Sequence, residues 1–277
     1  MAVQFGAVRT DAMEMEYFRF GTGERTMVIL PGLSVQSVLP FAGAVAQAYD
    51  ELTRDFTIYL FDRRKNLPQP YSIDEMAQDT VSAFEMLGLR DIYLFGASQG
   101  GMIAMTIAVS CPALVKKLAL GSTAAAIQGE QMRVIAHWMD LAKAQDGVGL
   151  YLDFGRHIYP PETFEMYRTA LIAAGSRVTQ AEFARFTVLA ATTEGFSLLD
   201  RLDEIRCPVL AIGAKDDAVL GCEATLAIAA RLSARPDFRL HLYTGYGHAS
   251  YDLAPDYKQR LLRFFRANEE KKGAANI

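Results

Sequence analysis

The sequence has few cysteines, and they follow no regular spacing. Only Cys111, Cys207 and Cys222 occur among 277 residues. An odd number of scattered thiols cannot form a complete disulfide framework, and their spacing does not match that of a metal site. None has a nearby histidine in the sequence, so a catalytic cysteine is not expected. The cysteine content therefore favours a reducing compartment, the cytoplasm. We expect no metal and no cofactor.

Long apolar runs are also absent. No run approaches the roughly 20 apolar residues that a membrane-spanning helix needs. The first 20 residues contain Asp11, Glu14 and Glu16, and they lack both the basic start and the apolar centre of a secretory signal. We therefore expect no membrane span and no secretion signal.

A strong excess of one charge is the third absence. Lysine and arginine together number 28, aspartate and glutamate 32, so the net charge is -4. Such a chain has no broad positive field to attract nucleic acid or an anionic membrane. Hydrophobic residues make up 51% of the chain, which is ample for a sizeable core. The composition favours a globular protein whose partner is a small molecule, and it leaves monomer and homodimer both open.

Short apolar runs typical of buried strands alternate with segments of helical apolar spacing. Ser72 and Glu75 form a capping box that begins one of these helices. Residues 14–20 and 26–30 are expected to form an antiparallel hairpin that leads into the sheet. The alternation predicts an α/β fold with a mostly parallel, doubly wound central sheet covered on both faces. The predicted buried strands are 26–30, 56–61, 91–95, 118–121, 207–213 and 238–243.

Between residues 124 and 202 this alternation stops. The segment is helical in pattern and rich in large apolar side chains, which is typical of a lid inserted into a core domain. We therefore predict a core of residues 1–123 and 203–277 and a lid of residues 124–202. The large side chains of the lid favour a substrate with an apolar or aromatic group. The predicted substrate-binding residues are Ser34 in the core and Trp138, Met139 and Phe154 in the lid.

The most informative short motif is Gly96-Ala97-Ser98-Gln99-Gly100. An apolar strand pattern enters it and a helical pattern leaves it, so Ser98 lies at a sharp strand-to-helix corner. Small residues two positions before and after the serine allow backbone segments to approach closely there. The context, rather than the short motif alone, indicates a nucleophile elbow with Ser98 exposed at its tip.

A serine hydroxyl needs a base, and the base needs an orienting carboxylate. His248 follows a predicted strand in a loop with two glycines, which makes it the preferred base. Two carboxylates, Asp216 and Asp217, follow another strand. We choose Asp216 as the orienting acid and interpret Asp217 as a loop carboxylate in solvent. The order serine, aspartate, histidine is the one associated with this elbow.

An oxyanion on the attacked carbonyl needs two preorganised donors. The backbone N–H of Gln99 is one candidate because it begins the helix after Ser98. The other is the N–H of Leu33, in a loop that leaves a neighbouring strand at the same sheet edge. Gly32 allows that loop to approach the serine closely.

Together these motifs make the chain resemble the α/β-hydrolase fold superfamily. The matching strings are Gly21-Thr22-Gly23, Leu30-Pro31-Gly32, Gly96-Ala97-Ser98-Gln99-Gly100-Gly101, Pro208-Val209-Leu210-Ala211-Ile212-Gly213-Ala214-Lys215-Asp216 and Gly245-Tyr246-Gly247-His248. The resemblance implies a triad of Ser98, Asp216 and His248, with backbone donors at Leu33 and Gln99.

The chain departs from the family pattern at two places. Pro31 stands where a histidine is often found, which leaves the donor role of the loop intact. Arg63, Arg64 and Lys65 follow Asp62 where the family often has a glycine-rich loop. These cations either pair a substrate carboxylate or form a solvated basic loop.

The sequence thus predicts a serine hydrolase that cleaves a small carboxylic ester or thioester through an acyl-enzyme on Ser98. A lactonase or a carbon–carbon bond hydrolase would use the same residues. A slow-turnover small-molecule receptor of the same fold is the alternative from another class.

Overall fold

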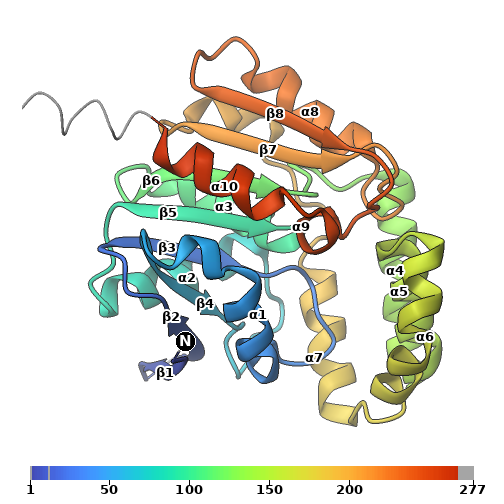
Figure 1. The fold of residues 1–277 in the computed structure, drawn as a ribbon. Coiled ribbons are helices and arrows are strands. Elements are labelled where there is room, and N and C mark those ends of the chain that lie inside the picture. The colour runs from blue at the N-terminus through green and yellow to red at the C-terminus, as the bar shows by residue number, and fades with distance from the viewer. Residues whose placement is uncertain (1, 12, 268–277) are drawn as a thin grey trace, which may run out of the picture.

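A single eight-stranded sheet crosses the protein (Figure 1). The computed structural model describes residues 2–11 and 13–267; the part of the predicted core at residues 268–277 lies outside them. The strand order is β1-β2-β4-β3-β5-β6-β7-β8. β2 pairs antiparallel with β1 and β4, and the remaining neighbours are parallel, as predicted. The strands are β1 (Gln4–Arg9), β2 (Glu14–Phe20), β3 (Arg25–Leu30), β4 (Phe56–Phe61), β5 (Ile92–Ala97), β6 (Val115–Gly121), β7 (Val209–Ala214) and β8 (Phe238–Tyr243).

Helices cover both faces of the sheet, which confirms the doubly wound α/β fold. Alternate residues of β5 belong to opposite cores: Leu94 packs in one and Phe95 in the other. This two-sided burial explains why the central strands are apolar throughout rather than alternating. One face carries α2 (Ile73–Met86), α3 (Gln99–Ser110) and α8 (Cys222–Leu232), and the other carries α1 (Ala42–Ala48) and α10 (Tyr257–Arg266). The short helices are η1 (Leu39–Phe41), η2 (Asp50–Leu52), η3 (Leu199–Glu204) and α9 (Ser250–Leu253).

The predicted hairpin between residues 14–20 and 26–30 is wrong. β2 and β3 do not pair with each other, because both flank β4. The connection between them crosses the start of β4, where the N–H groups of Thr22 and Gly23 donate to the Thr53 carbonyl at 3.0 and 3.2 Å. β2 forms its hairpin with β1 instead.

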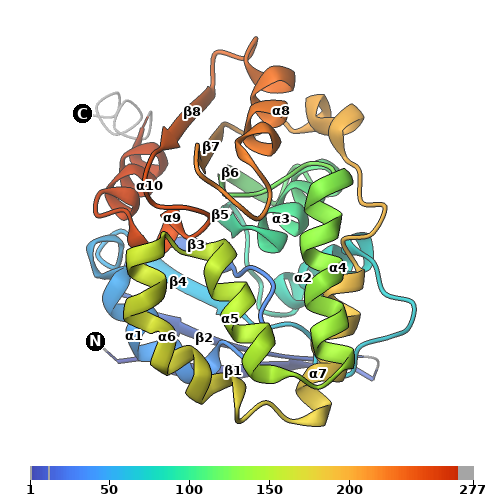
Figure 2. The same cartoon turned by 90° about the vertical axis from the view of Figure 1, so that its right-hand side faces the viewer.

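Four helices are inserted between β6 and β7. They lie beyond the edge where the parallel strands end, a side of the molecule that is on the right in Figure 1 and faces the viewer in Figure 2. We call residues 124–202 the helical insertion. Its helices are α4 (Gly129–Lys143), α5 (Gly147–Ile158), α6 (Pro161–Gly175) and α7 (Gln180–Ala191).

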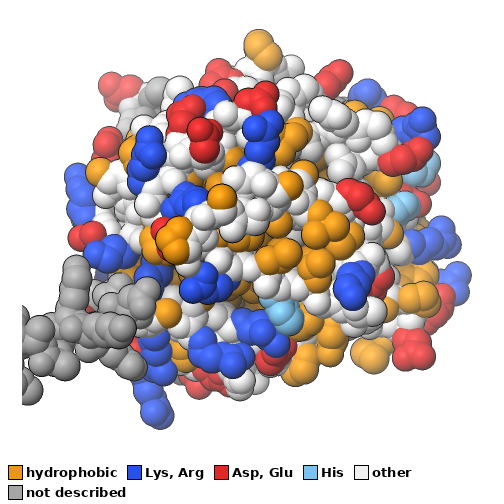
Figure 3. Space-filling view, turned by 90° about the horizontal axis from the view of Figure 1, so that it is seen from above, with side chains coloured by type: hydrophobic (Ala, Val, Ile, Leu, Met, Phe, Trp, Pro, Cys, Tyr) orange, Lys and Arg blue, Asp and Glu red, His pale blue; other side chains and the backbone are white. Residues whose placement is uncertain are grey.

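The surface above β8 carries acidic and basic side chains interspersed with apolar ones (Figure 3). This mixture agrees with the near balance of charge in the sequence. Across residues 2–11 and 13–267, no helix combines the length and the apolar character that crossing a bilayer would require.

The corner between β5 and α3 is packed backbone against backbone. A Cβ atom on Gly96 would lie 2.3 Å from the Gly100 carbonyl oxygen, and one on Gly100 would lie 2.0 Å from the Leu30 carbonyl oxygen. Atoms cannot approach that closely, so β3, β5 and α3 meet here only because both positions lack a side chain.

Replacing Gly96 by alanine tests this packing. We expect Gly96→Ala to lower the free energy of unfolding by about 2–3 kcal/mol, because the added methyl group overpacks a site walled by backbone. Gly43→Ala in α1 is the matched control: its Cβ meets nothing within 4 Å, and alanine should raise the stability by about 0.5 kcal/mol. Urea denaturation measures both values, and equal effects would contradict the packing argument.

Candidate active site

Ser98 lies at the corner between β5 and α3 with a backbone conformation that is rare for a side-chain-bearing residue. Its φ is 52° and its ψ is -123°. Such a conformation costs about 1–3 kcal/mol and persists only where neighbouring contacts hold it. The Ser98 N–H donates to the Gly121 carbonyl at 2.8 Å, and the Thr123 hydroxyl donates to the Ser98 carbonyl at 2.6 Å. The end of β6 therefore holds the serine in place.

His248 lies in the loop after β8 and is almost completely buried. Its Nδ1 is 2.9 and 3.0 Å from the two carboxylate oxygens of Asp217. An ionised carboxylate only accepts hydrogen bonds, so Nδ1 carries the proton of the neutral ring and Nε2 is left with a lone pair. Nε2 is thus the ring nitrogen available to accept a proton.

The choice of Asp216 as the carboxylate that orients His248 is wrong. Asp217 makes that contact, with only 8% of its surface exposed. Asp216 is exposed, and its carboxylate accepts the N–H groups of Gly245 and Gly247, both at 3.0 Å. Asp216 therefore holds the loop that carries His248 but does not contact the imidazole.

Asp217 is ionised despite its burial. Burial would raise the pKa of its carboxyl group, but the adjacent His248 ring and the N–H groups of Leu220 and Val219 outweigh burial and hold the pKa below its usual value. Those N–H groups donate to Oδ1 at 3.0 and 2.9 Å. The negative charge beside Nδ1 would stabilise an imidazolium formed on His248.

The two expected backbone donors border the serine. Gln99 is the first residue of α3, so its N–H has no acceptor within the helix and points out of the positive end of the helix dipole. Leu33 belongs to the loop after β3. Gly32 in that loop is close enough that a Cβ there would lie 3.2 Å from Ser98 Cβ. Both residues line the same cavity as Ser98.

A buried arginine supports this loop from behind. Arg63 is 8% exposed and donates from Nη2 to the Pro31 carbonyl at 2.6 Å and to Gln99 Oε1 at 3.5 Å. Burial lowers the pKa of Arg63 to about 10, so it is still charged at neutral pH. Neither predicted role, substrate carboxylate partner or solvated cation, fits Arg63. It joins the loop after β3 to the start of α3.

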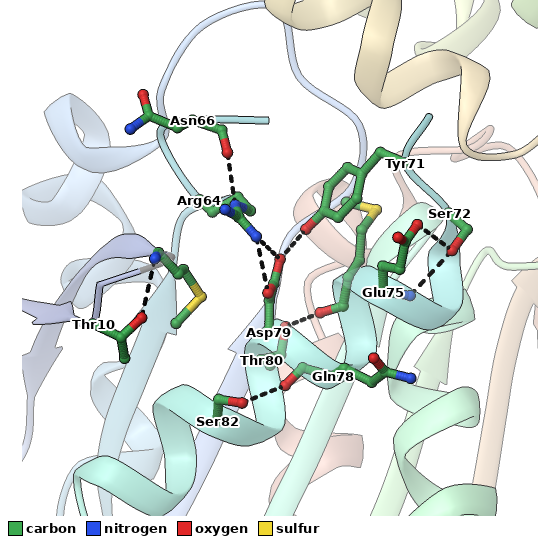
Figure 4. A network of polar contacts seen from close by, with 12 residues as sticks. Thr10, Arg64, Asn66, Tyr71, Ser72, Glu75, Gln78, Asp79, Thr80 and Ser82 are labelled. Atoms are coloured by element: carbon green, nitrogen blue, oxygen red, sulfur yellow. Dashed lines mark hydrogen bonds and ion pairs between the residues drawn. The ribbon is translucent and has the colours of Figure 1, made fainter. Parts of the chain in front are cut away.

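The two neighbouring cations are paired with carboxylates. Arg64 contacts both carboxylate oxygens of Asp79 at 3.1 and 3.2 Å, and the Tyr71 hydroxyl donates to the same carboxylate at 2.6 Å (Figure 4). Lys65 pairs with two acidic side chains of β2. None of the three cations that follow Asp62 lines the Ser98 cavity.

The helical insertion contacts the core through polar groups around the cavity. Arg185 of α7 pairs with Asp62 at 2.9 Å. The Gln99 side chain donates to the Leu189 carbonyl at 2.7 Å and to the Thr192 hydroxyl at 3.0 Å. Arg185 and Arg63 each keep one buried nitrogen without a partner among the described residues. Two guanidinium nitrogens at the boundary between the helical insertion and the core are therefore buried without a hydrogen bond among the described residues.

The cavity in front of Ser98 is small and mostly apolar, with a volume of about 30 Å³. Of the predicted substrate-binding residues, Trp138 and Phe154 line it, and their ring centroids are 4.4 Å apart. Ser34 does not line it, and the Ser34 hydroxyl donates to the Gln36 carbonyl. Met139 is packed in the core instead. The lining consists of Gly32, Leu33, Ser98, Gln99, Met102, Ile135, Trp138, Phe154, Ile158, Thr193, Val219, Leu220, His248 and Tyr251.

Val219, Leu220 and Tyr251 are among the cavity residues that the sequence did not predict. Val219 and Leu220 lie two and three residues after Asp217, and their apolar character is the signal in the sequence that the segment after Asp217 turns into the interior. Tyr251 lies three residues after His248 with its ring centroid 6.1 Å from the imidazole. Nothing in the sequence distinguished it from other aromatic residues.

The cavity lining contains no Lys, Arg or Glu, and its one histidine is His248. Within the described ranges, no cluster of three or more His, Cys, Asp or Glu side chains is arranged to hold a metal ion. The site offers a hydroxyl, an imidazole oriented by a carboxylate, and backbone donors. That set can deliver a nucleophile to an uncharged carbonyl compound and stabilise the anion that forms.

Comparison with known proteins agrees with the fold. A family model described as "Alpha/beta hydrolase family" matches residues 27–257. The putative carbamate hydrolase RutD of Rhizobium rhizogenes is 27% identical over 235 residues, which cover 81% of this chain and 88% of that protein.

Solved structures show the same similarity of fold. MGS-M2, an alpha/beta hydrolase enzyme from a deep-sea metagenome library, has a TM-score of 0.85 at 19% identity, over 95% of this chain and 98% of that one. The enol-lactonase of Burkholderia xenovorans has a TM-score of 0.80 at 17% identity, over 94% of this chain and 99% of that one.

Proton NMR tests which aspartate contacts His248. We expect a downfield imidazole N–H resonance that disappears in His248→Ala and is lost or shifted upfield in Asp217→Asn, because a strong charged acceptor is removed. Asp216→Asn is the matched control and should keep the resonance. Loss of the signal in Asp216→Asn alone would contradict the assignment.

Proposed function

The chain belongs to the alpha/beta hydrolase family, which supports a hydrolase, and we propose that it is a serine hydrolase that cleaves small carboxylic esters through an acyl-enzyme on Ser98. The observation that carries this proposal is the cavity that His248 shares with the serine of the β5–α3 corner, with the buried Asp217 carboxylate behind the imidazole. A buried carboxylate beside the imidazole has a clear use if the ring must become charged during a reaction.

In the proposed mechanism, Ser98 Oγ attacks the ester carbonyl while His248 Nε2 takes the hydroxyl proton. Within the described residues the Ser98 hydroxyl has no hydrogen-bond partner, so rotation of its side chain is free to bring it to Nε2. The tetrahedral oxyanion accepts hydrogen bonds from the N–H groups of Leu33 and Gln99. Asp217 holds the ring and stabilises its positive charge.

The oxyanion then collapses and the C–O bond to the alcohol breaks, with the Nε2 proton passing to the leaving oxygen. Water, deprotonated by His248, attacks the acyl-enzyme. A second collapse releases the carboxylic acid and returns the proton to Ser98. The apolar lining of the cavity favours substrates that are uncharged next to the carbonyl.

We further propose that the helical insertion acts as a lid on the core of residues 1–123 and 203–277. The cavity of about 30 Å³ is much smaller than the roughly 300 Å³ of a small ligand pocket. Substrate entry therefore requires displacement of side chains or of the insertion itself.

A second candidate reaction is carbamate hydrolysis. It is favoured by the relative described as a putative carbamate hydrolase, which matches over 81% of this chain. The same serine, base and oxyanion donors act on a carbamate carbonyl, so the leaving group and the cavity wall decide between the two. Lactone and carbon–carbon bond hydrolysis place the same demands on Ser98 and His248.

A fluorophosphonate probe and a substrate panel test the proposal. We expect a covalent adduct on Ser98 by mass spectrometry, and none on Ser98→Ala. On the best of the short-chain aryl esters, lactones and aryl carbamates, Ser98→Ala and His248→Ala should lower kcat by on the order of 10⁴ or more. Asp217→Asn should approach that loss, and Asp216→Asn should cause a far smaller one.

An unlabelled Ser98 in the folded protein would contradict the proposed nucleophile. Absence of turnover across the panel, combined with a small molecule that raises Tm, would favour the slow-turnover receptor instead.

The contact between Arg63 and the Pro31 carbonyl makes Arg63 a positioning residue for the oxyanion loop. We expect Arg63→Met to lower kcat by about tenfold or more with little change in KM, because misplaced donors weaken binding of the transition state rather than the substrate. Arg63→Lys should restore part of the loss. Arg64→Met is the matched control. An equal fall in Tm for both methionine variants with no kinetic difference would contradict this role.

A further inference from the structure

A second and larger cavity adjoins the Ser98 cavity. Its volume is about 590 Å³, and it lies between the start of α4 and the segment that joins β7 to α8. Its wall is mainly aliphatic, with Val134, Leu199 and Ala224 among the lining residues. Its polar lining residues are Gln128, Glu130, Gln131, Asp217 and Glu223, and no lysine or arginine lines it. The aliphatic part of the wall of this outer cavity, as we call it, suits an apolar chain, and the carboxylates without a cation disfavour an anionic one.

The two cavities share two lining residues. Val219 and Leu220 line both of them, and they are 5% and 2% exposed. Their N–H groups donate to Asp217 Oδ1, and the Leu220 carbonyl accepts from Gln131 Nε2 of α4 at 2.7 Å. The backbone of this segment is thus held on both sides. The partition itself consists of two aliphatic side chains, which can change rotamer without breaking those hydrogen bonds.

Size decides where a substrate must extend. A carbonyl group placed at Ser98 occupies much of a cavity of about 30 Å³. The rest of an ester must therefore extend beyond the wall of this cavity. The outer cavity meets that requirement, because it begins at the other side of Val219 and Leu220 and has the volume of an ordinary ligand pocket.

We propose that the outer cavity binds the apolar chain of the ester substrate, and that the side chains of Val219 and Leu220 determine how large a chain reaches it from Ser98. This inference rests on the proposed serine hydrolase activity. The apolar alkyl chain belongs to either the acyl or the alcohol part of the ester. Alkyl chains of the two parts have the same chemistry, and both extend away from the ester group.

The test compares chain-length profiles of kcat/KM. One series holds the alcohol constant, from p-nitrophenyl acetate to decanoate, and the other holds the acid constant, from ethyl to decyl acetate. We expect Leu220→Ala to raise the long-to-short ratio of kcat/KM about tenfold in one of the series, because the partition is reduced while the hydrogen bonds to Asp217 remain. The series that responds identifies which part of the ester enters the outer cavity.

Filling the outer cavity provides the opposite change. Ala227 lines only that cavity, so Ala227→Phe should lower the long-to-short ratio and should cancel the gain in the double variant with Leu220→Ala. Leu226→Ala is the matched control, because Leu226 is 43% exposed on the same helix and lines neither cavity. Its ratio should equal that of the unmodified protein. Val219→Ala replaces Leu220→Ala if the latter does not fold.

Ratios that do not change in Leu220→Ala, or a gain that survives Ala227→Phe, would overturn the proposal. Alkyl fluorophosphonates with short and long chains separate this failure from failure of the proposed function. Equal rates of Ser98 labelling by both probes in every variant would keep the serine nucleophile and reject the outer cavity as a chain site. No labelling by either probe in the folded protein would reject both.

Discussion

The close approach of three backbone segments at the β5–α3 corner is the constraint on which the rest of the site depends. Gly96 and Gly100 allow β3, β5 and α3 to meet at distances that no side chain tolerates. Because they meet, the loop after β3 lies against Ser98, and the first residue of α3, Gln99, lines the same cavity as Ser98. The proposed nucleophile, Ser98, and both proposed oxyanion donors therefore arise from one packing arrangement.

Burial of charge is the second theme of the site. Asp217 is ionised in the interior because His248 and two backbone N–H groups surround it. Arg63 is charged in the interior beside the Asp62 carboxylate, and it donates to the Pro31 carbonyl. Each buried charge holds a segment that borders Ser98. Burying a charge costs desolvation free energy, and the contacts that position these segments offset that cost. The two aspartates after β7 have different contacts: Asp217 orients the imidazole, and Asp216 holds the loop that carries it.

The fold followed from local patterns in the sequence. Uniformly apolar strands alternating with amphipathic helices indicated a two-sided parallel sheet, and the loss of that alternation at residues 124–202 indicated the insertion. Errors arose where pairing partners were not local: β2 pairs with β4 rather than with β3. At the site, Ser98 and His248 line one cavity as expected, whereas Ser34 and Met139 do not line it. Compartment and oligomeric state stay predictions.

By itself the sequence determined the corner at Ser98, because glycine spacing and a strand-to-helix change are local properties of the chain. Only the tertiary structure decided between Asp216 and Asp217, since adjacent side chains differ in which way they point once the segment is packed. It also decided that Arg63 is buried and that Val219 and Leu220 line two adjoining cavities. Those facts depend on segments far apart in the chain, and no local pattern records which of them come into contact.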